Sequence, residues 1–161
     1  MSLLDGIHSP ADVRALPMDQ LPMLAEEIRN RILEVVGQSG GHLTSNLGVT
    51  ELTIALHRVF DFSKDRLLWD VGHQCYPHKL LTGRHERFDT LRKAGGVSGF
   101  PDIHESDYDL FSVGHAGTAV ATAVGMARAD QILGRDNCVV ALVGDASIVN
   151  GVAVEGLNQA G

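Results

Sequence analysis

The chain has 161 residues, 44% of them hydrophobic, which is long enough for one domain with a substantial core. Its formal net charge of −7 argues against a nucleic-acid partner, because binding to a phosphate backbone needs patches of Lys and Arg. Two cysteines without disulfide-framework spacing, no secretory signal pattern and no apolar run as long as a membrane span predict a cytoplasmic protein without membrane contact.

The first third of the chain is predicted to be helical. Ser9-Pro10 is typical of a helix start, and apolar residues at helical spacing predict further helices from about Asp19 to Val36 and from Leu47 to Phe60. The loop Gly37 to Asn46 separates these two helices. The buried stripe expected for the later helix is Leu52, Ala55, Leu56, Val59 and Phe60.

The middle of the chain alternates between short predicted elements and loops. Asp65 to Asp70 is predicted to be a strand, and a second strand is predicted to end at Ser112 to His115. Ala94 to Asp109 forms a long loop, and loops of that length in compact domains are often functional. The small residues of Thr118 to Leu133 predict a helix that lies deep in a core or at a subunit interface.

A short apolar run near the end of the chain carries a carboxylate. Val139 to Val143 is typical of a strand buried on both faces, and Gly144-Asp145 follows it directly. Ser147 is expected to cap a helix that starts near Ile148. An Asp at such a junction is well placed to hold Mg²⁺ on a diphosphate, but Gly-Asp after a strand is also common in ordinary turns. Because Mg²⁺ takes about six oxygens, the single Asp also predicts that the chain is the front part of a larger domain.

Three histidines directly follow glycine, namely His42, His73 and His115. Two of them stand in an identical Val-Gly-His tripeptide at a predicted strand end, where α/β sheets gather ligands. An imidazole there can shuttle a proton or contact a phosphate, whereas any one of them taken singly can be a turn histidine. Zinc binding by His73, Cys75 and His78, with His85 not far behind, is a weaker alternative, since their spacing matches no standard zinc pattern and His85-Glu86 lacks the second histidine of the metalloprotease motif.

A series of ordered sequence blocks carries a resemblance to a known family. The blocks are Leu3-Leu-Asp-Gly-Ile7, Ser9-Pro-Ala-Asp12, Gly40-Gly-His42, Asn46-Leu-Gly48, Trp69-Asp-Val-Gly-His-Gln74, Tyr76-Pro-His-Lys79, Leu81-Thr-Gly-Arg84, Gly95-Gly-Val-Ser-Gly-Phe-Pro101, Glu105-Ser-Asp-Tyr-Asp109, Val113-Gly-His115 and Gly144-Asp145. Together they resemble the N-terminal part of the 1-deoxy-D-xylulose-5-phosphate synthase family, which are thiamine-diphosphate enzymes of the transketolase superfamily.

The resemblance implies an α/β fold, a partial three-layer parallel-sheet domain of the transketolase-like type. Residues 1–161 would be the N-terminal part of its diphosphate-binding domain, with the pyrimidine-binding and C-terminal domains outside the chain. Asp145 matches the family's metal ligand, and His42 matches a histidine near the reacting carbon. The positions that match cofactor-binding residues are His73, Gly114, His115, Ala116, Gly144, Ala146 and Ser147.

The activity that the resemblance implies is a transferase reaction with thiamine diphosphate and Mg²⁺. Pyruvate loses CO₂ and is joined to glyceraldehyde 3-phosphate, which feeds the synthesis of isoprenoid precursors, thiamine and pyridoxal. The family also implies a homodimer, and an isolated chain of this length is expected to be inactive. Two alternatives stay open, namely a transketolase-like subunit completed by a separate chain and a non-catalytic remnant that acts as an assembly module.

Two departures from the family pattern bear on these alternatives. Ala146 replaces the usual glycine after the metal-binding Asp, and alanine would be strained there if the position needs a positive φ. Ala116-Gly117 stands where hydroxyl residues are frequent in the family, so polar contacts to the cofactor would be lost.

Overall fold

The computed structural model describes residues 2–161, which form two compact units. The first unit consists of the chain up to Asp61 together with His73–Gly99, and the second consists of Phe62–Gly72 and Phe100–Gly161. No helix within residues 2–161 is long and apolar enough to cross a membrane.

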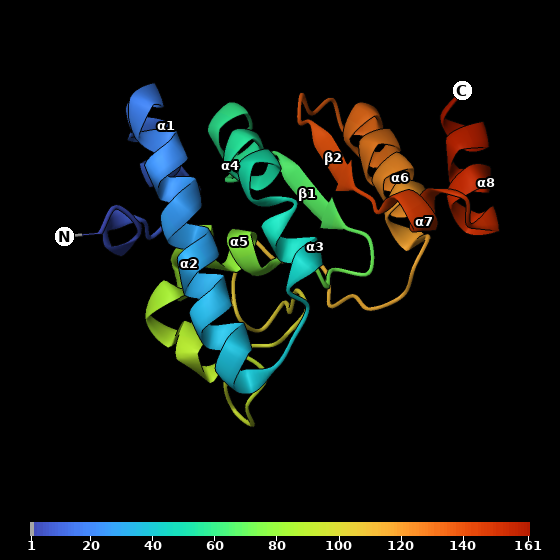
Figure 1. Cartoon of the computed structure of the whole chain (residues 1–161). Helices are drawn as coiled ribbons and strands as arrows, with labels where there is room; N and C mark the ends of the chain where they lie inside the picture. Colours follow the sequence, from blue (N-terminus) through green and yellow to red (C-terminus); the bar gives the residue numbers. More distant parts are fainter. Residues whose placement is uncertain (1) are drawn as a thin grey trace. The chain divides into compact units, whose positions relative to one another are not determined.

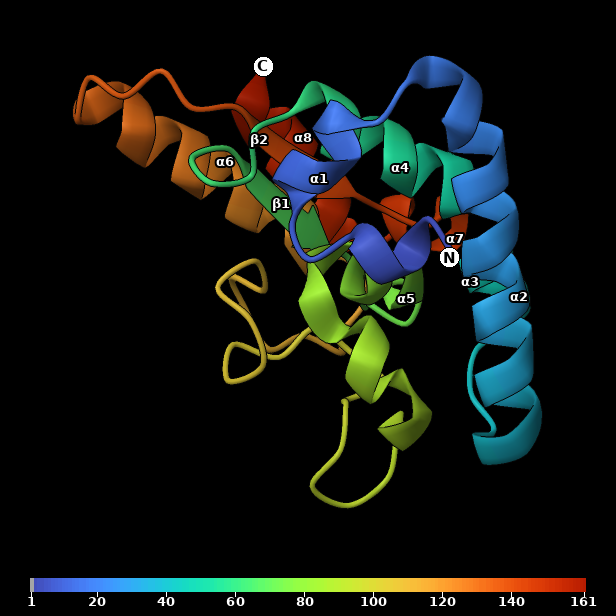
Figure 2. The ribbon, with the colours of Figure 1, turned by 90° about the vertical axis from the view of Figure 1, so that its left-hand side faces the viewer.

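The described residues of the first unit form helices and short helical turns. In chain order these are η1 (Leu4–Gly6), α1 (Pro10–Ala15), η2 (Met18–Gln20), α2 (Leu21–Ser39), α3 (Thr44–Leu47), α4 (Thr50–Val59), α5 (Tyr76–Lys79), η3 (Leu80–Arg84) and η4 (His85–Thr90). Helix α2 is the longest of them, and its blue ribbon runs along one side of this unit (Figure 2). The predicted second helix is therefore confirmed, and it continues to Ser39.

Helix α2 supplies much of the core of the first unit. Helical spacing marks seven apolar side chains, and six of them are at most 7% exposed, whereas Leu21 at the start of the helix is only half-buried: the six are Leu24, Ala25, Ile28, Ile32, Val35 and Val36. Gly40 ends the helix with a φ of 73°, a conformation that favours glycine. The amphipathic pattern of this helix was therefore sufficient to place its inner face.

The buried face of α4 is polar apart from Ile54, so the predicted apolar stripe is wrong. None of the side chains of that stripe is buried: Leu52, Ala55, Leu56, Val59 and Phe60. Thr50, Thr53 and His57 lie inside instead. Both threonine hydroxyls donate to backbone carbonyls one turn earlier, at 3.0 and 2.7 Å. Because the polar groups find partners, this helix can bury its polar side.

A hydrogen bond between two buried histidines joins α4 to α5. His57 Nε2 lies 2.9 Å from His78 Nδ1, and His57 Nδ1 lies 2.8 Å from the carbonyl oxygen of Thr53. Since a carbonyl only accepts, His57 Nδ1 carries the proton and its Nε2 accepts from His78. Burial, together with the nearby His78 ring, lowers the pKa of His57 from 6.5 to about 3.

We expect acid to destabilise the fold through His57. The unfolded chain takes up a proton there near pH 6.5, whereas the folded protein resists protonation down to about pH 3. Lowering the pH from 6.5 to 5 therefore removes about 2 kcal/mol of unfolding free energy through this group alone. Urea unfolding at both pH values measures the loss, which should shrink by that amount in His57→Gln and persist in the exposed His104→Gln. An equal loss in both variants would contradict this assignment.

The second unit contains a parallel two-stranded sheet. Strand β1 (Arg66–Trp69) pairs with β2 (Val139–Leu142), so that Arg66 lies opposite Val139 and Trp69 opposite Leu142. Figure 1 shows the two arrows side by side, with α6 next to β2. The helices of this unit are α6 (Thr118–Ile132), α7 (Asp145–Ile148) and α8 (Gly151–Ala160). The predicted α/β class is thus confirmed, with parallel strands and a helical connection.

Two expectations for the second unit are corrected. Residues 112–115 form no strand, and Val113 lines a small cavity beside β1 without a backbone hydrogen bond to that strand within residues 2–161. A run of four residues without a ladder partner has no reason to remain extended as a strand. Helix α6 is also not deep in a core, since its buried side chains are Ala119, Val120 and Asp130. Whether its exposed face lies at a subunit interface stays a prediction.

Gly156 lets α8 approach α6 closely. A Cβ atom on Gly156 would lie 2.9 Å from the backbone nitrogen of Ala121, which is closer than real Cβ contacts. We therefore expect Gly156→Ala to push the helices apart and to lower the unfolding free energy by about 1–3 kcal/mol. Gly125→Ala is the matched control, because a Cβ on Gly125 in α6 meets nothing within 4 Å. In thermal unfolding, the melting temperature should fall for Gly156→Ala and rise slightly for Gly125→Ala. Equal changes in the two variants would contradict the close-approach explanation.

Candidate functional site

The second unit places two carboxylates after the two parallel strands. Asp70 follows β1, and its backbone N–H donates to the carbonyl of Leu142 at 2.9 Å, which extends the ladder past Trp69. Asp145 follows β2 after Val143-Gly144. Both therefore emerge at the carboxyl edge of the sheet, the edge where α/β folds bind ligands.

The Asp70 carboxylate holds the start of α6. One oxygen accepts from the N–H of Gly117 at 2.9 Å, and the other accepts from the N–H of Ala119 at 3.1 Å. Asp70 is fully buried, so these charge-assisted bonds are shielded from water. They fix the end of the segment Gly114–Gly117, which includes three of the predicted cofactor-binding residues. The sequence analysis did not single out Asp70, although its place directly after a strand was a usable signal.

Gly117 is required by the conformation of this segment. Its φ is 85°, and a Cβ there would lie 2.6 Å from the Cγ of Asn150. Asn150 in turn caps α8, since its Oδ1 accepts from the N–H of Val152 at 2.9 Å. The predicted capping role of Ser147 is therefore wrong, because α7 begins at Asp145, with Gly144 as its N-cap residue. The glycine at 117 thus has a structural cause in this chain.

Asp145 and the residues beside it present unused polar groups. The Asp145 side chain is exposed, and within residues 2–161 its carboxylate makes no hydrogen bond or ion pair. The N–H groups of Asp145 and Ala146, at the first turn of α7, also donate to no protein acceptor in that range. Ala146 has no positive φ, since the non-glycine residues of 2–161 with one are Val71 and Arg92. Alanine is thus unstrained at position 146, and the donor set fits a metal-bound phosphate.

The first unit places His42 and His73 together. Their ring centroids are 5.1 Å apart, with the rings inclined by 64°. Partial burial lowers the pKa of His42 below its usual value, and the nearby His73 and Arg92 act electrostatically in the same direction. His42 is therefore neutral at physiological pH, and a neutral imidazole can accept a proton or donate one.

The buried side chain of Asn46 positions both histidines. Its Nδ2 donates to the carbonyl of His42 at 2.5 Å and to the carbonyl of His73 at 2.9 Å. Its Oδ1 accepts from the N–H of Tyr76 at 2.8 Å. One amide therefore joins three segments of the first unit. Asn46 belongs to one of the sequence blocks of the family resemblance, but the sequence alone did not indicate this role.

We expect Asn46→Leu to lower the unfolding free energy by about 3 kcal/mol or more. The leucine has a similar size, but it leaves one buried N–H and two carbonyls without this partner, and each such group costs about 1–3 kcal/mol. Urea unfolding measures the effect. Asn30→Leu on the exposed side of α2 is the control, and its effect should stay within about 0.5 kcal/mol. A similar small change in both variants would show that the Asn46 amide does not hold these segments.

His73 retains an unused polar atom. Its Nδ1 is shielded from solvent and has no hydrogen-bond partner within residues 2–161. Buried polar atoms in proteins are almost always paired, so an unpaired one at a predicted site is compatible with a bound group. Val71, two residues earlier, has a φ of 60°, which is an outlier for a β-branched residue. Such strain is often found at functional sites.

The structure thus distributes the predicted site residues over both units. His42 and His73 are in the first unit, where they lie close to each other. The second unit contains Gly114, His115, Ala116, Gly144, Asp145, Ala146 and Ser147. The alternative zinc set is not supported, because His73, Cys75 and His78 do not group as ligands within residues 2–161, while His85 groups with His8 and Glu86 instead.

Comparisons with known proteins agree on one family. A family model described as 1-deoxy-D-xylulose-5-phosphate synthase matches residues 4–161. Proteins of that name from Anaeromyxobacter sp. (strain Fw109-5) and Neisseria meningitidis serogroup C (strain 053442) are 57% and 56% identical to the chain over 159 residues. A protein named 1-deoxy-D-xylulose-5-phosphate synthase 1 from Geobacter sulfurreducens is 56% identical over 160 residues. Each alignment covers 99% of this chain and 25% of the relative, so the chain spans about a quarter of these proteins.

Proposed function

The chain belongs to the 1-deoxy-D-xylulose-5-phosphate synthase family, and we propose that the protein containing it joins pyruvate to glyceraldehyde 3-phosphate with loss of CO₂. The observation that carries this proposal is the identity of 54–57% to synthases over 99% of the chain. The product would serve isoprenoid and thiamine synthesis, and pyridoxal synthesis as well. In this proposal residues 1–161 are the N-terminal part of the diphosphate-binding domain, and the remaining domains lie outside this chain.

The cofactors in this proposal are thiamine diphosphate and Mg²⁺. Asp145 would be a metal ligand, which its exposed and unpaired carboxylate supports. Gly144, Ala146 and Ser147 would approach the diphosphate, where the free N–H groups at the start of α7 suit phosphate oxygens. Since Mg²⁺ takes about six oxygens, its other ligands would come from the diphosphate, water and residues outside this chain.

The segment before α6 would also contact the cofactor. Gly114, His115 and Ala116 are exposed, and the bonds from Gly117 and Ala119 to Asp70 anchor the segment at its end. His73 would contribute its unpaired Nδ1. Backbone that is held in place before binding loses less entropy when a ligand binds. Asp70 would accordingly be a positioning residue.

His42 would move protons near the reacting carbon. The cofactor supplies the electron sink that decarboxylation of pyruvate needs, so proton transfer is left to the protein. A histidine that is neutral at physiological pH suits this task, and Asn46 fixes its backbone. Family membership further supports a cytoplasmic homodimer, in which the exposed small-residue face of α6 is available for a subunit contact.

Binding of thiamine diphosphate tests the proposal against its alternatives. Calorimetry on the complete natural product of the reading frame should show binding that requires Mg²⁺. Its mass should be several times 17.3 kDa. A product near 17.3 kDa that co-purifies with a second chain would indicate a two-chain enzyme. Failure to bind the cofactor with Mg²⁺ present would overturn the proposal in favour of a non-catalytic module.

A further inference from the structure

Three metal-ligating side chains meet in the first unit, away from His42 and His73. One imidazole nitrogen of His8, one of His85 and a carboxylate oxygen of Glu86 all lie within 4.8 Å of one another. His8 comes from the segment before α1, whereas His85 and Glu86 begin η4. The fold therefore brings together ligands that the sequence places far apart.

The backbone holds His8 in this position. The Asp12 carboxylate in α1 accepts from the N–H of His8 at 3.0 Å and from the N–H of Ser9 at 2.8 Å. On the other side, Gly83 has a φ of 83° and lies against the His8 carbonyl, so that a Cβ there would be 2.7 Å from its oxygen. The two segments are thus fixed against each other before any ion arrives.

The three side chains have unused ligand capacity. His85 Nδ1 is shielded from solvent and lacks a hydrogen-bond partner within residues 2–161. The rings of His8 and His85 are 5.4 Å apart and inclined by 45°, and no hydrogen bond joins them. The Glu86 carboxylate is exposed and makes no ion pair or hydrogen bond in the described part of the chain. A buried imidazole nitrogen in a protein normally has a partner. A bound cation would provide the partner that His85 Nδ1 lacks within residues 2–161.

The donor set selects the class of ion. Two imidazoles and one carboxylate are typical ligands of Zn²⁺ and related divalent transition metals, with water in the fourth position. Mg²⁺ and Ca²⁺ prefer oxygen ligands, so the histidines disfavour them. We propose that His8, His85 and Glu86 bind one divalent transition-metal ion, for which Zn²⁺ is the best match. The bound ion would cross-link the segment before α1 to η4.

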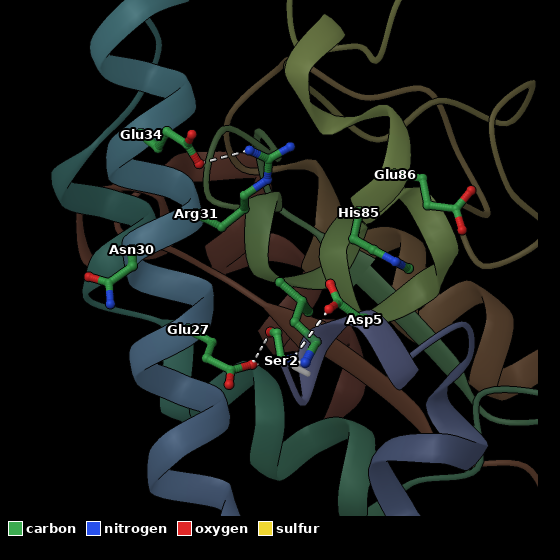
Figure 3. A pocket seen from close by; sticks show the side chains of 9 residues that line it. Ser2, Asp5, Glu27, Asn30, Arg31, Glu34, His85 and Glu86 are labelled. Carbon is green, nitrogen blue, oxygen red and sulfur yellow. Dashed lines mark hydrogen bonds and ion pairs between the residues drawn. The ribbon is translucent and has the colours of Figure 1, made fainter.

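An acidic pocket lies beside two of the three ligands. His85 and Glu86 line a pocket of about 670 Å³ that Asp5, Glu27 and Glu34 also line (Figure 3). The nearby Arg31 is already paired with Glu34 and Asp89, each at 2.8 Å. The net negative wall favours entry of a cation.

Zn²⁺ titration of the complete, metal-stripped protein tests the proposal in the absence of thiamine diphosphate. Competition with a chromophoric chelator should reveal a tight site that His8→Asn, His85→Asn and Glu86→Gln each weaken by about ten-fold or more, since even outer-shell changes cost 10–100-fold in affinity. His104→Asn, at an exposed histidine of the second unit, should leave the binding unchanged. At the same Zn²⁺ concentration, Zn²⁺ should also raise the melting temperature of wild type by more than that of His8→Asn.

Loss of folding does not obscure the result, because His8 is exposed and its replacement by asparagine removes little buried surface. Unchanged Zn²⁺ affinity and stoichiometry in both His8→Asn and His85→Asn would overturn the proposal. The same conclusion follows if Zn²⁺ stabilises His8→Asn as much as wild type.

Discussion

Replacing Asp145 by asparagine is expected to lower kcat/KM of the complete protein by about 100-fold or more. The substitution keeps the size of the side chain but removes the charge that would hold Mg²⁺ on the diphosphate, and losses of this size follow removal of a charge-stabilising group. The Asp145 carboxylate has no protein partner within residues 2–161, so its loss breaks no internal contact. Steady-state rates at several Mg²⁺ concentrations measure the effect, and half-saturation by Mg²⁺ should also rise.

Asp136→Asn is the matched control for Asp145. Asp136 is an exposed carboxylate that lies just before β2, at the opposite end of the strand from Asp145. It should leave the rate and the Mg²⁺ dependence unchanged. Equal rates in Asp145→Asn and wild type would exclude Asp145 as a metal ligand. Unfolding curves of the two variants should coincide, because both side chains are exposed.

Replacing His42 by alanine is expected to lower kcat by about 100-fold or more, which is typical for loss of a general acid or base. Partial burial and the nearby His73 and Arg92 lower the pKa of His42, so the neutral form persists below pH 6.5. The acid limb of the wild-type rate profile should therefore lie below pH 6.5, and it should disappear in the variant. Rate profiles between pH 5 and 9 measure both effects.

Cofactor binding separates this role from a structural one. The affinity for thiamine diphosphate should change only a few-fold in His42→Ala, because Asn46 holds the backbone carbonyl of residue 42 and not its imidazole. His104→Ala is the control and should retain the wild-type rate. A kcat within a few-fold of wild type in His42→Ala would show that His42 does not move the proton.

Local patterns in the sequence were sufficient for the regular elements. The apolar run Val139 to Val143 and the segment Asp65 to Asp70 correctly predicted the two strands that pair, and six of the seven apolar positions predicted for α2 are buried. In α2 and β1 the apolar pattern and the observed burial agree, whereas β2, expected to be buried on both faces, buries only Leu142 within residues 2–161. In α4 they disagree, because Thr53 and His57 are satisfied inside by a local carbonyl and a distant ring.

The residues of the candidate site were predictable from the sequence only where they belong to a recognisable motif. Asp145 and the glycine-linked histidines stand out in the chain, whereas the work of Asn46 and Asp70 depends on backbone groups from distant segments. No spacing rule connects His8 with His85 and Glu86 either, since the fold alone brings them together. For Ala146 the sequence predicted a strained backbone if the position needs a positive φ. The structure shows no positive φ there, so alanine is accommodated without strain.

Turnover by the complete protein tests the central claim most directly. Pyruvate labelled at its carboxyl carbon is incubated with the complete protein, glyceraldehyde 3-phosphate, thiamine diphosphate and Mg²⁺. Labelled CO₂ and 1-deoxy-D-xylulose 5-phosphate should form in equal amounts, and sustained turnover should require all of these components. The isolated chain of 161 residues should release none under the same conditions. Absence of labelled CO₂ and of the sugar phosphate from the complete, cofactor-saturated protein would contradict the account.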